Sequence, residues 1–310
     1  MIINTGQRTD IPAFYSEWFY RRIKEGFVYV RNPYYPSKVA CFQLNPKVVD
    51  CICFCTKNPK PMLSRLDELK DYRQFWHITI TPYDREIEPY VPLVKNVIQS
   101  FQQLSLKIGS HAVVWRYDPV FLNDKYTLDY HLKAFYYIAK NLSGYTQQCI
   151  ISFIDLYQKT KRNFPHVQEV SLEDQKIFIT KCVDIAKSFD IKVYTCLEDE
   201  ELAKYGAITK GCMTKEVIEQ ALNIELDVKD SHVRKGCRCL LGNDIGMYNT
   251  CLHGCLYCYA NENKELVRKQ YNLHDPHSPL LIGHLNEEDE LYKVKQKSLI
   301  DLQISLDIEV

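Results

Sequence analysis

The sequence predicts an α/β fold, a partial TIM-like barrel of six βα units with an inserted β-hairpin and a cysteine-rich loop near the C-terminus. Short apolar runs rich in β-branched and aromatic residues alternate with longer segments whose apolar residues recur at helical spacing. Hydrophobic residues make up 46% of the 310 residues, which is enough for a packed core. Six alternations favour a parallel sheet with right-handed crossovers that falls short of a complete eight-stranded barrel.

The six units follow one another along the chain. Strands are predicted at the apolar runs 1–4, 51–55, 75–81, 112–117, 148–153 and 192–195. Helices are predicted at 12–25, 61–70, 93–107, 127–142, 172–189 and 215–222. The first helix has Pro12 near its start and Gly26 just past its end, as helix termini prefer.

Other segments complete the predicted organisation. A turn-forming stretch at 31–37 separates two strand-like runs, which predicts a hairpin over about 27–44. The barrel is expected over 1–230, a cysteine-rich segment over 231–265 and a C-terminal extension over 266–310.

Charge and composition narrow the classes of function. Lys and Arg number 39, as do Asp and Glu, which argues against a protein that binds nucleic acid through a broad basic surface. A local basic string, Arg234, Lys235 and Arg238, could still bind a partner that carries phosphate, such as a nucleic acid. No signal sequence or run of 18 apolar residues occurs, so we expect no membrane association. Thirteen cysteines, an odd number, point to a reducing cytoplasm rather than to disulfides.

Parallel strands place their carboxyl ends at one edge of a sheet, where ligands bind in such folds. Arg116 and Asp118 are two residues apart on a predicted strand, so their side chains point to the same face of the sheet and could form an ion pair. A solvated loop is polar in any case, so any charged residue that follows a predicted strand could instead lie at the protein surface. Six charged side chains follow predicted strands closely enough to point into such a site: Arg8, Asp10, Lys57, Arg116, Asp118 and Asp155.

The most specific motif is C-x3-C-x2-C, formed by Cys251, Cys255 and Cys258. Three thiolates this close can each bind one iron of a cubane, which predicts an iron–sulfur loop whose fourth iron lacks a protein ligand. Gly254 allows a tight turn between the ligands, and Tyr257 precedes the last of them. Two alternatives stay open: the thiols pack as small apolar groups, or they hold zinc with His253 or Cys239 as the fourth ligand.

The other cysteines carry weaker signals. Cys237 and Cys239 form a C-x-C that could ligate a second site, cover the first or remain unligated. Cys51, Cys53 and Cys55 alternate along a predicted strand, about 7 Å apart, and are expected to pack in the core. No spacing signal attaches to Cys41, Cys149, Cys182, Cys196 and Cys212.

The cysteine motif, with an aromatic residue before its last cysteine, resembles the cluster loop of the radical S-adenosylmethionine (SAM) superfamily. The string CLHGCLYCYAN is similar to the loop of the spore-photoproduct-lyase-like branch. Together with QRTDIPAFYSEWF, RNPYYP, CTKNPKPML, WRYDP and SFIDLY, the chain resembles domain of unknown function 1848 over about 1–265. In the superfamily the loop normally follows the first strand, whereas here it follows the sixth unit. We expect it to fold back over the same edge.

The resemblance implies a [4Fe–4S] cluster on Cys251, Cys255 and Cys258, with SAM on the open iron. Reduction by a carrier such as flavodoxin or ferredoxin would cleave SAM to a 5′-deoxyadenosyl radical that acts on an unknown substrate. No Gly-Gly-Glu follows a strand, so the cofactor's amino group has no assigned partner. Candidate catalytic residues are Arg116, Asp118 and Asp10, and candidate cofactor contacts are Arg8, Lys57, Asp155 and Tyr257.

Two other classes of protein remain as alternatives. In the first, the cysteine segment is a zinc-stabilised cap and the barrel binds a ligand without redox chemistry. In the second, carboxylates such as Asp10 and Asp118 surround a divalent metal in a hydrolase, although no pair of histidine ligands follows a strand. Metal analysis separates the first alternative from an iron–sulfur protein.

Overall fold

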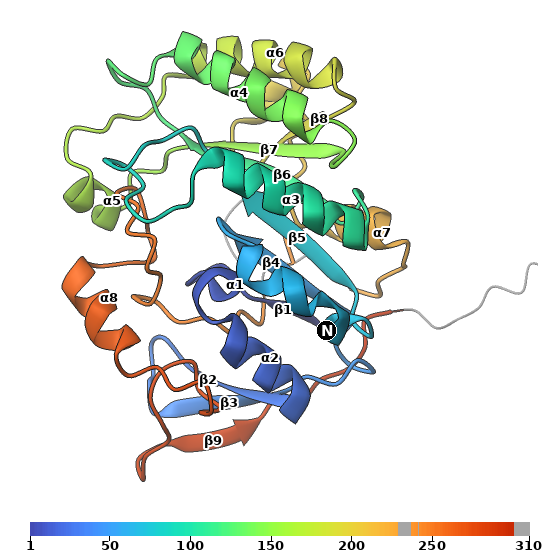
Figure 1. The fold of residues 1–310 in the computed structure, drawn as a ribbon, viewed down its shortest axis with the longest axis vertical. Coiled ribbons are helices and arrows are strands. Elements are labelled where there is room, and N and C mark those ends of the chain that lie inside the picture. Colours follow the sequence, from blue (N-terminus) through green and yellow to red (C-terminus); the bar gives the residue numbers. More distant parts are fainter. Residues whose placement is uncertain (229–236, 241, 301–310) are drawn as a thin grey trace, which may run out of the picture.

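A computed structural model describes residues 1–228, 237–240 and 242–300. Its main layer is a six-stranded parallel sheet flanked by helices, which confirms the α/β class (Figure 1). The strand order β1-β4-β5-β6-β7-β8 follows the chain, with β1 and β8 as the two edge strands of the sheet. The six predicted strands are confirmed at Ile2–Asn4 (β1), Cys51–Thr56 (β4), Gln74–Thr79 (β5), Val113–Val120 (β6), Gln148–Phe153 (β7) and Lys192–Thr195 (β8).

One face of the sheet carries the larger core. Alternate strand side chains such as Phe54, Trp76 and Trp115 point to this face, and the rings of Phe54 and Trp76 stack at 3.9 Å. Apolar side chains from the helices after each strand cover them. These helices are α1 (Ile11–Phe14), α2 (Ser16–Glu25), the 3₁₀ helix η1 (Lys60–Leu69), α3 (Val94–Ile108), α4 (Leu128–Leu142) and α6 (Leu172–Lys187).

The opposite face of the sheet is covered differently. Helix α7 (Lys215–Leu222) and residues 237–240 pack there against Cys51, Cys53 and Phe75. The helix predicted at 215–222 is confirmed, but it covers the face of the sheet opposite to the helices that follow the earlier strands. The 3₁₀ helix η2 (Glu200–Tyr205) follows β8 and contacts α6, after which the chain crosses to the inner face. Helical periodicity gives the apolar side of a helix but not the sheet face that it covers.

A second, three-stranded sheet contains the predicted hairpin. Strands β2 (Phe27–Arg31) and β3 (Lys38–Gln43) pair antiparallel, with Phe27 opposite Gln43. Strand β9 (Glu290–Lys293) from the C-terminal extension adds to β3 in parallel, so this extension joins the hairpin. Residues 301–310 of the extension lie outside the described residues.

Helix ends depart from the prediction where side chains serve other contacts. The helix predicted at 12–25 divides at Tyr15, whose hydroxyl donates to the Thr250 carbonyl at 2.7 Å. Gly26 ends α2 in the left-handed region, as expected. Three short helices of the described residues were not predicted, η2, α5 (Gln158–Asn163) and α8 (Lys264–Tyr271).

The segment leading to the loop of Cys251, Cys255 and Cys258 lies beside the first strand. The amide of Asn4 donates to the Asn243 carbonyl at 3.1 Å, and the amide of Ile245 donates to the Asn4 carbonyl at 2.9 Å. Arg8 closes this contact from the loop after β1, because its Nε donates to Asp244 at 2.9 Å. A loop late in the chain thus reaches the carboxyl end of β1.

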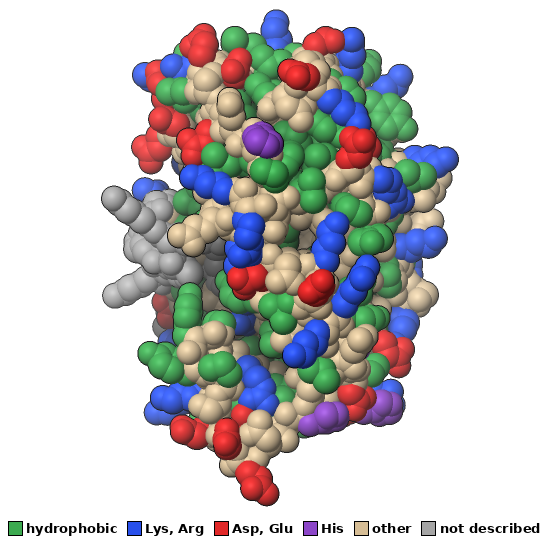
Figure 2. Space-filling view, turned by 90° about the vertical axis from the view of Figure 1, so that its left-hand side faces the viewer, with side chains coloured by type: hydrophobic (Ala, Val, Ile, Leu, Met, Phe, Trp, Pro, Cys, Tyr) green, Lys and Arg blue, Asp and Glu red, His purple; other side chains and the backbone are tan. Residues whose placement is uncertain are grey.

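Figure 2 shows the side of the molecule on which α5 and α8 lie in Figure 1. Lys and Arg side chains gather near its middle, interspersed with carboxylates, so this side does not carry charge of a single sign. Arg234 and Lys235 of the basic string lie outside the described residues. No helix in the described part of the chain is long and apolar enough to cross a bilayer.

Candidate metal and ligand site

A pocket of about 300 Å³ opens at the carboxyl edge of the parallel sheet. This volume is at the lower end of the range for small-molecule sites. Its walls are strand-end residues, including Lys57, Asp118 and Asp155, together with the loop that carries Cys251, Cys255 and Cys258. Residues from opposite ends of the chain therefore border one cavity.

The cluster loop, residues 251–258, is shaped by local contacts. Gly254 has φ of +70°, and a Cβ there would lie 3.2 Å from the Tyr90 ring, so both backbone and space favour glycine. The amide of Cys258 donates to the Cys255 carbonyl at 3.2 Å. Asn261 Nδ2 donates to the Cys251 carbonyl at 2.7 Å. The loop turns between its cysteines, which are each partly exposed.

The spread of these sulfurs distinguishes two kinds of metal site. Ligand sulfurs of a tetrahedral zinc lie about 3.8 Å apart, given a Zn–S bond of about 2.3 Å. Among the described residues, Cys251, Cys255 and Cys258 do not bring their sulfurs within 4.8 Å of one another. Burial raises the pKa of each of the three thiols. The wider spacing suits a polynuclear cluster in which each thiolate binds a different iron.

Asp10 anchors the cluster loop to the sheet. Its Oδ1 accepts from the amide of Ala13 at 3.0 Å, capping α1, and its Oδ2 accepts from the amide of Lys57 at 2.8 Å. The same Oδ2 lies 2.8 Å from Nε2 of His253 in the cluster loop. The buried Nδ1 of that imidazole has no hydrogen-bond partner among the described residues. The carboxylate is thus occupied by positioning contacts.

Glu88 is a second anchor, and sequence reasoning missed it. This buried carboxylate accepts from Lys57 Nζ at 2.9 Å, from Thr81 Oγ1 at 2.6 Å and from the Tyr257 hydroxyl. Burial, the largest single influence, would lower the pKa of Lys57, but the Glu88 carboxylate together with the nearby Cys255 and Asp118 raises it. Glu88 lies nine residues beyond the end of β5, in a loop without a motif, so no signal in the sequence marks it.

The predicted pairing of Arg116 with Asp118 is confirmed, with Arg116 Nε donating to Oδ2 at 3.2 Å. Arg116 also points Nη1 toward Cys212 Sγ at 3.4 Å and toward His77 Nδ1 at 3.5 Å. Burial, with a smaller contribution from Arg116, lowers the pKa of His77 to about 3, so its imidazole is neutral. The Arg116 guanidinium therefore contacts both Asp118 in the pocket and the buried groups on the inner face of the sheet.

The other predicted site residues differ in whether they line the pocket. Asp118, Asp155 and Tyr257 line the pocket, and Asp155 accepts from the Tyr157 hydroxyl at 3.2 Å. Arg8 is not among the lining residues, because Asp244 holds its guanidinium.

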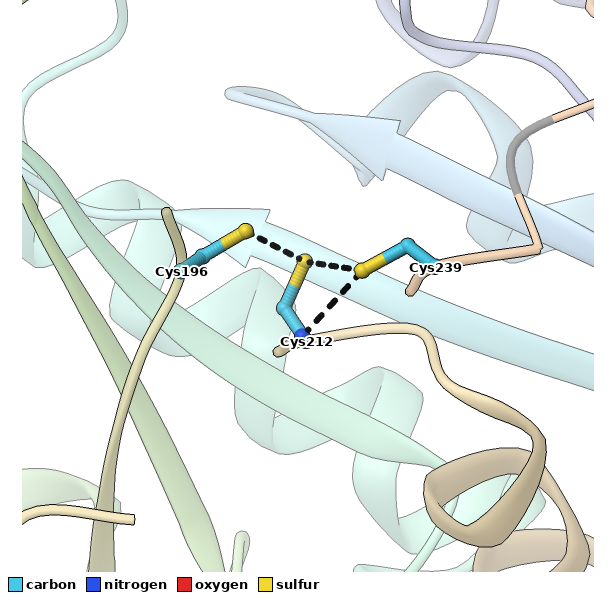
Figure 3. Close-up of side chains that lie close together, drawn as sticks. All are labelled: Cys196, Cys212 and Cys239. Atoms are coloured by element: carbon cyan, nitrogen blue, oxygen red, sulfur yellow. Dashed lines mark hydrogen bonds between the residues drawn. The ribbon is translucent and has the colours of Figure 1, made fainter. Parts of the chain in front are cut away.

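The side chains of a second cysteine trio, Cys196, Cys212 and Cys239, converge (Figure 3), and the first two of these residues line the pocket. The Cys212 sulfur lies 3.3 Å from that of Cys196 and 3.7 Å from that of Cys239. Hydrogen bonds from the neighbouring thiols, and then the Arg116 charge, lower the pKa of Cys212. These three residues could hold a metal ion.

Sequence reasoning gave no signal for this thiol trio as a set. Cys196 follows β8, Cys212 precedes α7 and Cys239 comes from the cysteine-rich segment, so no short spacing connects them. Cys239 joins Cys196 and Cys212 here, which leaves the zinc alternative at the cluster loop without that ligand.

Cys51, Cys53 and Cys55 share the inner face of β4, as predicted, with the first two fully buried. Their expected separation of about 7 Å describes the backbone repeat rather than the sulfurs. The sulfurs of Cys51 and Cys53 lie only 3.8 Å apart, because the side chains lean toward each other.

The family model described as "Domain of unknown function (DUF1848)" matches residues 2–260. The chain belongs to this family. The match covers the parallel sheet, the hairpin and the complete cluster loop of this DUF1848 protein. No curated protein matches the chain.

Proposed function

We propose that this DUF1848 protein is a radical SAM enzyme that holds a [4Fe–4S] cluster on Cys251, Cys255 and Cys258. The observation that carries the proposal is the arrangement of these thiols. They belong to one tight loop, they border a pocket of about 300 Å³, and their sulfurs do not all lie within 4.8 Å of one another, which suits a polynuclear cluster better than one mononuclear ion. Three ligands leave one iron free to bind SAM. When bound, the cluster would supply the electron that cleaves SAM reductively.

The protein's own residues would orient the loop and its ligand. Asp10 and Glu88 tie the loop to strand ends through His253 and Tyr257. Both carboxylates are at least nine-tenths buried, so these contacts are shielded from water. The loop is therefore held in one position relative to the sheet, as a preorganised site requires.

The pocket charges suit a zwitterionic ligand with an added sulfonium charge. Lys57 and Arg116 are cationic, and Asp118 and Asp155 offer carboxylates on the same cavity wall. We assign SAM and substrate contacts to Lys57, Asp118 and Asp155, and a positioning role to Asp10 and Tyr257. Arg116 would act through its ion pair with Asp118.

The proposal also includes the architecture of the sheet, the cellular compartment and the electron donor. The sheet, with strands in chain order and one helical outer layer, would be a partial barrel whose inner face carries the site. All thirteen cysteines are free thiols, which suits a reducing cytoplasm. A small carrier such as flavodoxin or ferredoxin would deliver the electron.

Anaerobic reconstitution with iron and sulfide tests the proposal. We expect bound iron, labile sulfide and, on reduction with dithionite in the presence of SAM, release of 5′-deoxyadenosine and methionine. A colourless protein that binds zinc at the cluster loop, and that leaves SAM intact, would instead support the zinc-stabilised ligand-binding protein.

A further inference from the structure

We infer that Cys196, Cys212 and Cys239 form a second metal site, a mononuclear Zn²⁺ site whose fourth coordination position faces the pocket. The inference does not rest on radical chemistry, because none of these cysteines belongs to the cluster loop. It concerns a thiol trio that no short sequence motif connects.

The sulfur separations fit a single ion. Sulfurs at the corners of a tetrahedron around zinc lie about 3.8 Å apart, from a Zn–S bond of about 2.3 Å. The measured separations are 3.3 Å from Cys196 to Cys212 and 3.7 Å from Cys212 to Cys239. All three sulfurs lie within 4.8 Å of one another. Soft thiolates are the ligands that favour zinc over harder divalent ions.

Donors around the trio favour thiolates. Cys239 Sγ accepts from the amide of Cys212 at 3.4 Å and from that of Met213 at 3.3 Å. Arg116 Nη1 donates to Cys212 Sγ at 3.4 Å. Three thiolates around Zn²⁺ carry one net negative charge, which the neighbouring guanidinium offsets. A disulfide would use two sulfurs only and would leave the third thiol with donors that suit an anion.

The fourth coordination position is open toward the pocket. No fourth His, Cys, Asp or Glu in the described ranges comes within 4.8 Å of all three sulfurs. Cys196 and Cys212 line the pocket, whereas Cys239 is fully buried behind them. Zinc sites that react with ligands keep three protein ligands and one exchangeable position. A small molecule bearing a thiol matches the softness of this site and would lie in the cavity that the cluster loop also borders.

Metal binding to the full chain tests the inference. Protein stripped with a chelator and reduced anaerobically is titrated with Zn²⁺ alone, and separately with Co²⁺ as a spectroscopic probe. We expect one ion per chain and a sulfur-to-cobalt charge-transfer band. Cys212→Ala and Cys196→Ala should weaken this binding by at least about 100-fold, since each removes a ligand. The matched control Cys182→Ala, which removes a buried thiol from α6, should bind as the parent does.

A chain in which Cys251, Cys255 and Cys258 are all changed to Ala keeps the two proposals apart. It should still bind one Zn²⁺, even if the radical function is lost or was wrongly assigned. Unchanged zinc binding in Cys212→Ala, no zinc binding by the folded parent, or a Cys196–Cys212 disulfide that persists under reduction would each overturn the inference.

Alkylation of the parent protein covers the case in which the Ala variants fail to fold. Zn²⁺ should protect Cys196 from iodoacetamide more than it protects Cys55, another partly exposed thiol of the pocket. Equal labelling of Cys196 with and without Zn²⁺ would contradict the site. Addition of 2-mercaptoethanol to the Co²⁺ form should shift its spectrum. An unchanged spectrum would mean that a fourth protein ligand closes the site.

Discussion

The two cysteine trios border one pocket but are built in opposite ways. Cys251, Cys255 and Cys258 come from one short loop, and their sulfurs lie apart. Cys196, Cys212 and Cys239 come from three distant segments, and their sulfurs converge. Closeness in sequence therefore does not measure closeness of ligand atoms. A tight turn can spread thiols over a cluster, whereas a fold can collect distant thiols around one ion.

The two trios also differ in what holds them. Buried carboxylates fix the cluster loop, with Asp10 contacting His253 and Glu88 contacting Tyr257. Backbone amides and Arg116 surround the thiol trio instead. Because their supports are separate, substitutions should affect one trio at a time.

The largest expected effect is on iron at the cluster loop. Cys255→Ala should remove nearly all iron and labile sulfide from reconstituted protein, because two thiolates cannot hold the cluster, and should leave zinc binding unchanged. Elemental analysis of both metals measures this. Cys53→Ala, a buried thiol of β4, is the matched control and should keep both metals. Equal iron in the two variants would remove the distinction between the trios.

Glu88→Gln tests the anchor of the cluster loop. Glu88 is 2% exposed, and the change leaves the buried Lys57 ammonium without its carboxylate partner. We expect a loss of about 3–5 kcal/mol in the free energy of unfolding, measured with urea. Iron content should fall in part.

The control for that change is Glu86→Gln, at an exposed ion pair with Lys125. It should change stability by no more than about 0.5 kcal/mol. If both variants were equally stable, Glu88 would not be the anchor that its contacts indicate.

Arg116→Gln should act on the thiol trio and spare the iron. It removes the cation beside Cys212, so zinc affinity should fall by about 10–100-fold. Competition with a zinc chelator measures the affinity, and Arg65→Gln, at an exposed pair with Glu68, is the control. A parallel loss of iron would show that the two sites are coupled through Arg116.

Protonation of His131 distinguishes acid unfolding of the chain from acid loss of the metal. Burial lowers the pKa of His131, on the outer helix α4, to about 4. The unfolded chain takes up this proton near pH 6.5, so stability is lost as pH falls from about 6.5 to 4, at about 1.4 kcal/mol per pH unit. His131→Gln should be less stable at neutral pH, and its stability should fall less steeply with acid by this amount, while buried His77 keeps its own contribution. Urea unfolding of metal-free protein measures it, and an equal slope in both proteins would assign the acid sensitivity elsewhere.

Much of the fold was predictable from the sequence because the strands are strongly apolar. The runs at 148–153 and 192–195 became β7 and β8 without change of bounds. The placement of α7 was not predictable, because its apolar side fits either face of the sheet. Nor was the division at Tyr15, whose hydroxyl donates to the carbonyl of the distant Thr250.

The candidate site, like the fold, was predictable only in part. Strand ends brought Lys57, Asp118 and Asp155 to one pocket with the cluster loop, as chain order in a parallel sheet suggests. Glu88 and the convergence of Cys196 with Cys212 depend on tertiary contacts between segments that share no motif. Local sequence patterns do not predict such contacts.

If the three cysteines of the cluster loop bind a [4Fe–4S] cluster, one of its irons is open to SAM. Electron paramagnetic resonance of the reduced, reconstituted protein, recorded with and without SAM, tests it most directly. We predict a signal of a reduced [4Fe–4S] cluster whose g-values shift when SAM is added. The signal should be absent in Cys255→Ala and unchanged in position in Cys212→Ala. A cluster signal that does not respond to SAM would contradict the account, because a fourth protein ligand would then close the cluster.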